Sequence, residues 1–406
     1  MKILIISHGG GSPYHGPNMR WYYLGTALKS MGVDVSIASS SYFHKFFNFP
    51  EVNSSYSVEE IDGIEYVWLK TNKYSGRMSQ IINQAWFSLK SFFLLPQLAR
   101  KEKYDAVIAS SPHPFVVFAA RRCANVLGVP FIYEVRDLWP LVIQELSGAS
   151  DSHPYIRLVS FAERYAVRNA NAIVSVKPGD GKYFGERYGV SESRFHYIPN
   201  GFLPSRNVQL EKNRDQNAPF VIGYVGALSS YYCIDNLIGA ARVLKDHQDV
   251  HFRIVGGGED LGKLKNLAFQ YGLENISFTG KVSKDKVVEE LERFDACYVG
   301  LKEVKANLYG ISCNKIFEYM YAAKPIVASY ITNYDPVQMA GCGVTIRSGT
   351  PEQLGEAILN LKENPELARD MGKKGREFFD QNHDFKLIAG RYNELLSSLI
   401  SRRNNA

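Results

Sequence analysis

Tyr309–Tyr330 has the sequence YGISCNKIFEYMYAAKPIVASY, which predicts a loop, a helix and a buried strand in direct succession. Ser312 is a common N-cap residue, and apolar residues recur at helical spacing in residues 315–320. Pro325 ends the helix, and PIVAS is the short apolar run typical of a strand in a parallel sheet that is covered on both faces. The stretch therefore predicts part of a doubly wound α/β domain.

Two charged side chains lie in this predicted helix, Lys315 in its first turn and Glu318 about one turn further along. A helix N-terminus presents free N–H groups and a partial positive charge, so it suits a phosphate. A carboxylate such as that of Glu318 can accept two hydrogen bonds from a sugar diol. Together these features predict a site for a nucleotide sugar.

The rest of the sequence repeats strands and helices in two similar halves. Each half begins with a strand, a loop, a helix and a second strand, which implies right-handed βαβ units and parallel sheets. The expected fold is α/β, with two doubly wound, Rossmann-like domains that face each other across a cleft. The opening elements are KILIIS, helix Met19–Ser30 and VDVSIAS, then FVIGYVGAL, helix Asn236–Asp246 and HFRIVG. Further strands are predicted at YDAVIAS, PFIYEVR and NAIVSV, and at ISFTG, DACYVGL and PIVAS.

The polar segment PSRNVQLEKNRDQNAP lacks apolar periodicity and marks the boundary between the two halves. We expect a first domain at residues 1–199, a linker at 200–219, a second domain at 220–383 and a final helix within 384–406. A chain of 406 residues is long enough for two domains that each bury a core.

Composition narrows the class of protein. The net charge of +6 is a mild bias that suits an anionic substrate or membrane surface, and no dense Lys/Arg block with interleaved aromatics favours nucleic acid. No apolar run reaches the roughly 18 residues of a membrane span, and MKILIIS lacks a signal-peptide cleavage site, so we expect a cytoplasmic protein. The five cysteines form no CxxC pair, which argues against a disulfide framework and a zinc site.

Three motifs resemble a known family. YEVRDLWP (133–140), IPNGF (198–202) and Tyr309–Tyr330 resemble retaining glycosyltransferases of family GT4, which have the GT-B fold. The first resembles the subgroup that builds bacterial O-antigen and capsule sugars, and the second resembles the hinge into the second domain. In the third motif, Glu318 matches the second of the family's two glutamates, whereas Gly310 stands in the place of the first.

The resemblance implies where each substrate binds. The second domain would bind the nucleotide sugar, the first would bind the acceptor, and the final helix would cross back to the first domain. His113, in ASSPHPF, would hydrogen-bond the transferring sugar and form the catalytic set with Lys315 and Glu318. The implied donor site consists of Gly256, Gly257, Gly258, Lys281, Val282, Gly310, Ile311, Ser312, Asn314 and Glu318. The implied acceptor side of the cleft consists of Gly10, Gly11, Arg136 and Asp137.

These assignments have structural alternatives. The glycines at 10–11 and at 256–258 each follow a predicted strand and also fit a plain βα turn. His113 also fits a solvated loop. Arg136 fits equally well an ion pair with Glu134 or Asp137 that only stabilises the fold.

The chain departs from the family at the expected diphosphate site. Family members commonly have an arginine and a lysine after the strand that matches GYVGAL, whereas Leu228–Cys233 contains no cation. The diphosphate charge must then be met by Lys315, by N–H groups near the start of its helix, and by Lys302 or Lys305. The sequence contains no Asp-x-Asp, which favours a site without a divalent metal.

Ile81–Leu98, IINQAWFSLKSFFLLPQL, is apolar and rich in aromatics, and Arg100, Lys101 and Lys103 follow it. The segment is too short and too polar to span a bilayer. It fits either a helix that lies on a membrane surface, with its basic residues toward lipid headgroups, or a core helix of the first domain.

Together these features predict a retaining, metal-independent glycosyltransferase without a cofactor, whose co-substrate is a nucleotide sugar, expected to be a UDP-sugar. It would move a sugar of the N-acetylated hexosamine type to a glycan or lipid-linked acceptor in bacterial surface-polysaccharide assembly. Two alternatives stay open: a sugar-nucleotide epimerase or hydrolase of the same fold, or a non-catalytic subunit that binds the nucleotide sugar.

Overall fold

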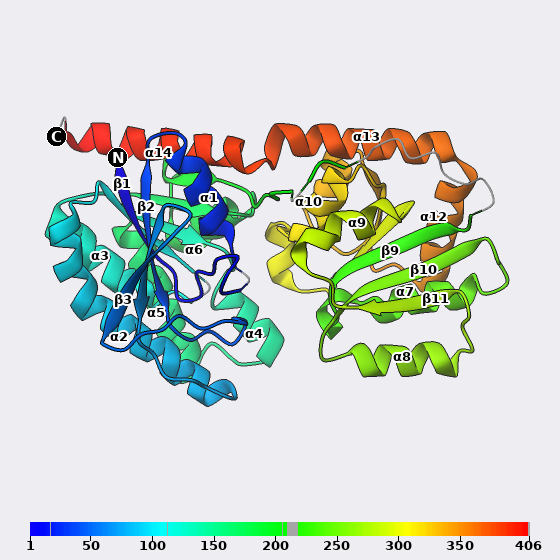
Figure 1. Cartoon of the computed structure of the whole chain (residues 1–406), viewed down its shortest axis with the longest axis horizontal. Coiled ribbons are helices and arrows are strands. Elements are labelled where there is room, and N and C mark those ends of the chain that lie inside the picture. Colours follow the sequence, from blue (N-terminus) through cyan, green and yellow to red (C-terminus); the bar gives the residue numbers. More distant parts are fainter. Residues whose placement is uncertain (17, 112, 205, 209–217, 405–406) are drawn as a thin grey trace. The chain divides into compact units, whose positions relative to one another are not determined.

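The computed structural model describes residues 1–16, 18–111, 113–204, 206–208 and 218–404 (Figure 1). The chain forms two compact units, which change over between Asn200 and Gly201 and again between Asp384 and Phe385. Each unit contains its own sheet, and both sheets have the crossover order of a doubly wound α/β fold. The predicted fold class of two parallel-sheet domains is therefore confirmed.

The sheet of unit 1 has the strand order β3-β4-β2-β1-β5-β6-β7-β8. Every neighbouring pair is parallel except the hairpin β3–β4. Asp62 and Gly63 join this hairpin with positive φ angles of 50° and 77°, as a type I′ turn requires. The strands are β1 Lys2–Ile6, β2 Asp34–Ser40, β3 Tyr56–Ile61, β4 Ile64–Leu69, β5 Ala106–Ser110, β6 Phe131–Val135, β7 Ala172–Ser175 and β8 Phe195–Tyr197.

Helix α14 (Phe385–Asn404) belongs to unit 1, although it comes after all of unit 2 in the sequence. It packs against α1 (Arg20–Lys29), and the core they share includes Trp21, Leu24, Ile388 and Tyr392. The other helices of unit 1 are α2 Arg77–Glu102, α3 Val116–Leu127, α4 Leu141–Ser147, α5 Pro154–Asn169 and α6 Asp180–Tyr188, with a 3-10 turn η1 at Glu192–Arg194. No helix among the described residues is long and apolar enough to cross a membrane.

Unit 2 has an entirely parallel sheet with the order β11-β10-β9-β12-β13-β14. Its strands are β9 Phe220–Ala227, β10 Val250–Gly257, β11 Ile276–Gly280, β12 Ala296–Gly300, β13 Ile326–Ser329 and β14 Gly343–Ile346. Its helices are α7 Ile234–Val243, α8 Leu261–Gln270, α9 Val287–Glu292, α10 Asn314–Tyr321, α11 Pro336–Ala340, α12 Pro351–Glu363 and α13 Pro365–Asn382. Short 3-10 turns are η2 Ser230–Tyr232, η3 Lys284–Lys286 and η4 Lys305–Tyr309.

The expected linker begins with Asn200 in unit 1, and the residues from Gly201 onward belong to unit 2. Phe202 forms a parallel bridge with Asp384, and its N–H donates to the carbonyl of His383 at 3.2 Å. The two passages of the chain into and out of unit 2 therefore lie side by side. Residues 205 and 209–217 of the expected linker lie outside the described residues.

Each sheet has one point where the strand order reverses direction, between β1 and β5 in unit 1 and between β9 and β12 in unit 2. In doubly wound sheets, ligands bind beyond the carboxyl ends of the strands at this point. The segments of interest are therefore those after Ile6 and Ser110 in unit 1, and after Ala227 and Gly300 in unit 2.

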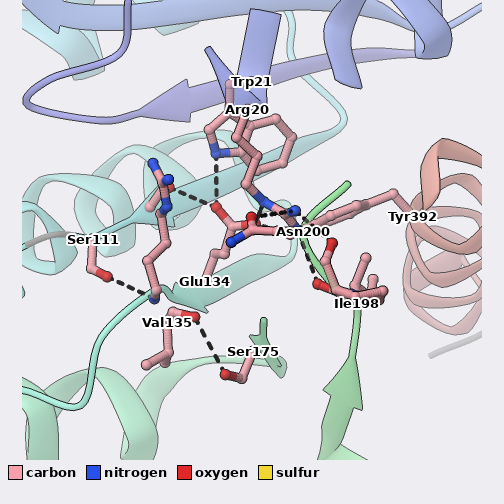
Figure 2. A network of polar contacts seen from close by, with 12 residues as sticks. Arg20, Trp21, Ser111, Glu134, Val135, Ser175, Ile198, Asn200 and Tyr392 are labelled. Atoms are coloured by element: carbon pink, nitrogen blue, oxygen red, sulfur yellow. Dashed lines mark hydrogen bonds and ion pairs between the residues drawn. The ribbon is translucent and has the colours of Figure 1, made fainter. Parts of the chain in front are cut away.

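A buried carboxylate on β6, Glu134, connects the elements of unit 1 (Figure 2). Its oxygens accept hydrogen bonds from Arg20 Nε at 3.0 Å, Trp21 Nε1 at 2.8 Å, Ser110 Oγ at 2.6 Å and Tyr392 OH at 2.5 Å. The Arg20 guanidinium also donates to the carbonyls of Ile198 and Pro199 and to Asn200 Oδ1. This one cluster joins α1, β5, β6, α14 and the chain that leads into unit 2.

Burial alone would raise the pKa of Glu134, but the Arg20 charge and the hydrogen bonds from Ser110 and Tyr392 hold that pKa below its ordinary value. Because the folded pKa lies below the unfolded one, the stability that Glu134 contributes is complete above its unfolded pKa. That stability is lost as the pH falls through the folded pKa.

Glu134→Gln keeps the shape of this side chain and removes the charge that faces Arg20. Removing one partner of a buried ion pair costs about 3–5 kcal/mol, so we expect a loss of that size in the free energy of unfolding. All four tryptophans lie in unit 1, so fluorescence in a urea titration reports its unfolding. The exposed pair of Glu102 with Lys2 is the control, and Glu102→Gln should cost less than about 1 kcal/mol. Equal losses in the two variants would contradict the role given to Glu134.

Candidate functional site

The carboxyl ends of β9 and β10 approach each other closely at two glycines. Gly226 and Gly256 have φ angles of 152° and 151°, and a Cβ on Gly256 would lie 1.8 Å from the Gly226 carbonyl oxygen. A Cβ on Gly258 would lie 2.1 Å from the carbonyl oxygen of Leu228. These glycines are thus required by the packing of the protein's own backbone. Contact of Gly256, Gly257 or Gly258 with a ligand stays a prediction.

Lys315, the second residue of α10, is buried at this edge of the sheet. Its Nζ donates to Tyr224 OH at 2.8 Å and lies 3.2 Å from the centroid of the Tyr232 ring. Gly226 makes room for it, since a Cβ there would lie 3.0 Å from Lys315 Cε. Among the described carboxylates none forms an ion pair with Lys315, and burial lowers its pKa to about 8. Lys315 is therefore a cation held by aromatic groups at the strand-order reversal of unit 2.

Tyr232 lies in the segment Leu228–Cys233, which has no cation in this chain. The neighbouring Tyr231 donates its OH to Asn307 Oδ1 at 3.0 Å, and its carbonyl accepts from the N–H of Lys302 at 2.7 Å. The segment is thus fixed against the loop that follows β12. Aromatic side chains here hold the cation that α10 provides.

Glu318 lies one turn after Lys315 and is also buried. One of its oxygens accepts from Lys284 Nζ, whose side chain is 47% exposed. A diol that binds both oxygens of Glu318 must share or displace Lys284, and the contact of Glu318 with a sugar diol stays a prediction. Lys284 was not among the predicted residues, since VSKDK has no periodicity that would indicate which lysine faces Glu318.

The predicted N-cap of α10 is wrong by one residue. The helix begins at Asn314, and the N-cap is Cys313, whose side chain makes no capping hydrogen bond. The N–H groups of the first turn therefore have no side-chain acceptor at the N-cap, which leaves the helix end suited to an anion. Asn314 is exposed, whereas Ile311 is buried in the hydrophobic core of unit 2.

The other predicted donor residues lie around this edge in different ways. Lys281 extends over Gly257, where a Cβ would lie 2.8 Å from Lys281 Cε. Val282 packs partly against the core. Gly310 ends η4 with a φ of 121°. Gly256–Gly258, Lys281 and Lys315 are thus grouped near the ends of β9 and β10.

In unit 1, His8 and His113 follow β1 and β5, the strands at the reversal point. Both side chains are buried, and their ring centroids are 4.9 Å apart. The alternative of a solvated loop for His113 is therefore wrong. Burial lowers the pKa of His8 to about 4 and holds the pKa of His113 well below its ordinary value, so both rings are neutral at pH 7.

Three of the four nitrogens in this histidine pair have no hydrogen-bond partner among the described residues: His8 Nδ1, His113 Nδ1 and His113 Nε2. The fourth, His8 Nε2, lies 2.7 Å from Asn83 Oδ1. Unpaired buried polar atoms are rare and costly, so these nitrogens are suited to the hydroxyl groups of a ligand. His8 and Asn83 were not predicted as site residues, although Gly10 and Gly11 of the same loop, which has the sequence HGGG from His8, were predicted.

Arg136, at the end of β6, is half-buried, and its guanidinium makes no hydrogen bond or ion pair with a described residue. Arg20 pairs with Glu134, so the alternative of a structural ion pair of Arg136 with Glu134 or Asp137 is absent from the described part of the chain. Asp137, the next residue, is exposed.

The two predicted acceptor-side glycines have packing roles as well. A Cβ on Gly10 would lie 3.1 Å from Ile37 Cγ2, and the Gly11 carbonyl accepts a hydrogen bond from Tyr66 OH.

Two family models match the chain in succession. The model described as glycosyl transferase 4-like domain matches residues 15–201, and the model described as glycosyl transferases group 1 matches residues 205–378. Together with the two doubly wound sheets, these matches define a glycosyltransferase of the GT-B fold. The chain belongs to family GT4 and resembles its bacterial polysaccharide transferases.

Relatives differ in how much of their length they share with this chain. The uncharacterized glycosyltransferase MJ1069 of Methanocaldococcus jannaschii is 29% identical over 181 residues, 44% of this chain and 45% of its own, so the chain spans less than half of that relative. WcaI of Escherichia coli K12, named for colanic acid biosynthesis, is 22% identical over 88% of this chain and 85% of its own. The structure of HepE from Anabaena with UDP has a TM-score of 0.68 at 17% identity, covering 98% of this chain and 100% of HepE.

The environment of Lys315 predicts a pH-dependent affinity for a nucleoside diphosphate. Lys315 is cationic below about pH 8, so the Kd for UDP should rise as the pH rises from 7 to 9. Lys315→Arg should flatten this dependence, because a guanidinium stays charged over the whole range, and Lys315→Met should bind weakly throughout. Calorimetry at several pH values gives each Kd. A wild-type Kd that is constant over this range would contradict the assignment.

Proposed function

We propose that this protein transfers a sugar from a nucleoside-diphosphate sugar to an acceptor in the assembly of a bacterial surface polysaccharide. The observation that carries the proposal is the group at the strand-order reversal of unit 2, where Lys315 and the start of α10, whose N-cap side chain makes no capping hydrogen bond, lie about one turn from the buried Glu318. Cationic and N–H groups suit a diphosphate, and a carboxylate suits a diol.

The donor we propose is a UDP-sugar of the N-acetylated hexosamine type. The UDP complex of HepE, which shares the fold, supports the choice of nucleotide. The likeness of YEVRDLWP to the O-antigen and capsule subgroup supports the choice of sugar and pathway, and the name of WcaI agrees with an envelope polysaccharide.

We further propose that the transfer retains the anomeric configuration and needs no metal. Lys315 and the helix N-terminus would neutralise the leaving diphosphate in place of a divalent ion, and the sequence has no Asp-x-Asp to hold one. The acceptor hydroxyl would attack the anomeric carbon from the side of the leaving group as the bond to the diphosphate breaks. The departing phosphate oxygen would then take the hydroxyl proton.

Unit 1 would bind the acceptor, a glycan or a lipid-linked sugar. The nitrogens of His8 and His113 that have no partner among the described residues offer hydrogen bonds to sugar hydroxyls, and Arg136, whose guanidinium is paired with none of those residues, offers a charge to an anionic group. His113, neutral and buried, would hold the transferring sugar through its ring nitrogen rather than by proton transfer, since its pKa is far below neutral.

The first test is transfer in the presence of excess EDTA, followed as UDP release with a panel of UDP-sugars and polyprenyl-linked acceptors. We expect release that depends on the acceptor and persists with the chelator. A rate that collapses with EDTA and returns with manganese would contradict the metal-free proposal. Free sugar or a C2 epimer without acceptor would favour the hydrolase or epimerase alternative, and absence of release with every acceptor would favour a non-catalytic subunit.

A pair of variants separates donor binding from the chemical step. Glu318→Gln should weaken UDP-sugar binding by roughly 2–4 kcal/mol, because it removes a charged acceptor of hydrogen bonds. His113→Ala should leave the Kd for UDP almost unchanged and lower turnover, as expected for a contact made mainly in the transition state. Calorimetry and UDP release measure the two effects. Unchanged donor affinity in the first variant, or full turnover in the second, would remove that residue from the site.

A further inference from the structure

Helix α2 (Arg77–Glu102) exposes an apolar face in addition to the one it packs inward through Phe87 and Leu95, which is unusual for a helix packed on a soluble domain. Its inward face includes the buried polar side chains Asn83, Gln84 and Ser91. Its outward face is apolar over four turns, and each large side chain on it is between 43% and 72% exposed. These exposed residues, which we call the α2 stripe, are Met78, Ile82, Trp86, Leu89 and Phe93.

The spacing of the α2 stripe, every three or four residues, places its members on one side of the helix. The stripe extends for about 22 Å at about 1.5 Å per residue. Exposed apolar side chains are ordinary when they are scattered, but a continuous row on one element indicates a surface that another phase or molecule covers.

The orientation of α2 is fixed by polar contacts on its inner side. Asn83 Oδ1 bonds His8, and its Nδ2 donates to the carbonyl of Asn72 at 2.5 Å. Gln84 Oε1 accepts from Tyr155 OH at 3.4 Å. Rotating the helix to bury the α2 stripe would break these bonds, so the stripe faces outward in the folded unit.

Basic side chains border the α2 stripe. Lys90 Nζ lies 5.6 Å from the centroid of the Trp86 ring, and the guanidinium of Arg122 on α3 lies 5.6 Å from that of Phe93. Arg100, Lys101 and Lys103 are exposed at the end of the helix.

Helix α5, which packs on α3 beside α2, extends this surface. Its Leu158 and Phe161 are exposed, and Phe161 stacks on Phe118 of α3 with centroids 6.1 Å apart. Arg157 and Arg164 are exposed on the same helix. Carboxylates on the three helices do not oppose this charge: Glu102 pairs with Lys2, and Glu163 is buried.

We propose that the α2 stripe, with the neighbouring parts of α3 and α5, binds the surface of an anionic membrane. The aromatic and aliphatic side chains would enter the boundary between headgroups and acyl chains, while the bordering lysines and arginines contact lipid phosphates. The apolar row and its basic border select an anionic lipid surface over a protein groove, because Glu102, the exposed carboxylate on these three helices, is already paired with Lys2. This binding goes beyond the proposed function, and it can be measured with no donor or acceptor present.

The experiment is flotation of the full chain with vesicles of phosphatidylcholine containing phosphatidylglycerol, compared with phosphatidylcholine alone. We expect binding to the anionic vesicles that weakens in high salt. The double variant Leu89→Glu, Phe93→Glu should lower the bound fraction by roughly tenfold or more, since it puts charge into the apolar row. Phe269→Glu on α8 of unit 2, where Phe269 is 87% exposed, is the matched control and should bind as the wild type does. Thermal unfolding of each variant confirms that it is folded.

The fluorescence of Trp86 reports vesicle binding at the α2 stripe itself. Trp21 and Trp68 are buried and Trp139 is half-buried, so the part of a vesicle-induced blue shift that Trp86→Phe removes reports Trp86. Trp86→Phe keeps the apolar row and should bind the vesicles but lose most of the shift.

Three outcomes would overturn the proposal. One is a wild-type chain that floats with neither vesicle. Another is an equal loss of binding in Phe269→Glu. The third is a wild-type dimer, independent of lipid, that Leu89→Glu, Phe93→Glu converts to a monomer, which would make the stripe a protein interface. Each outcome leaves the test of sugar transfer unaffected.

Discussion

One carboxylate without exposed surface, Glu134, determines how the first unit is assembled. Its bonds to Arg20, Trp21, Ser110 and Tyr392 fix two neighbouring strands, the first helix and the last helix around a single charge. Arg20, held by that charge, also fixes the backbone that leads into unit 2. Because a buried ion pair is stable only when all its partners are in place, these elements must adopt their positions together.

The sequence predicted the parallel strands and the fold class because apolar runs and βα alternation are local signals. It did not predict the hairpin β3–β4, although Asp62–Gly63 is a typical type I′ turn, because β3 carries the exposed Glu59 and Glu60 and is buried only at Ile61. The start of α10 was also missed by one residue. Ser312 is the better cap by chemistry, but the chain places Cys313 there, where the packing of Ile311 in the core sets the position.

The candidate sites were predicted in part. Lys315, Glu318 and His113 come from recognisable motifs, and the structure buries each of them at the carboxyl edge of its own sheet. Lys284, His8 and Asn83 could not be predicted from spacing, because their partners are between 34 and 105 residues away in the sequence and meet only through tertiary packing. Motifs identify residues, whereas pairing partners depend on topology.

The position of α14 has a consequence for biosynthesis. Ile388 and Tyr392 complete the core that contains Trp21 and Leu24, yet they are translated after every residue of unit 2. During translation, unit 1 therefore has an exposed apolar face, and Glu134 lacks its hydrogen bond from Tyr392, until α14 has been synthesised. Fragments that stop before Phe385 would share this defect, so the first unit is not separable by simple truncation, even though it is compact. In this protein the N-terminal domain is the last to be finished.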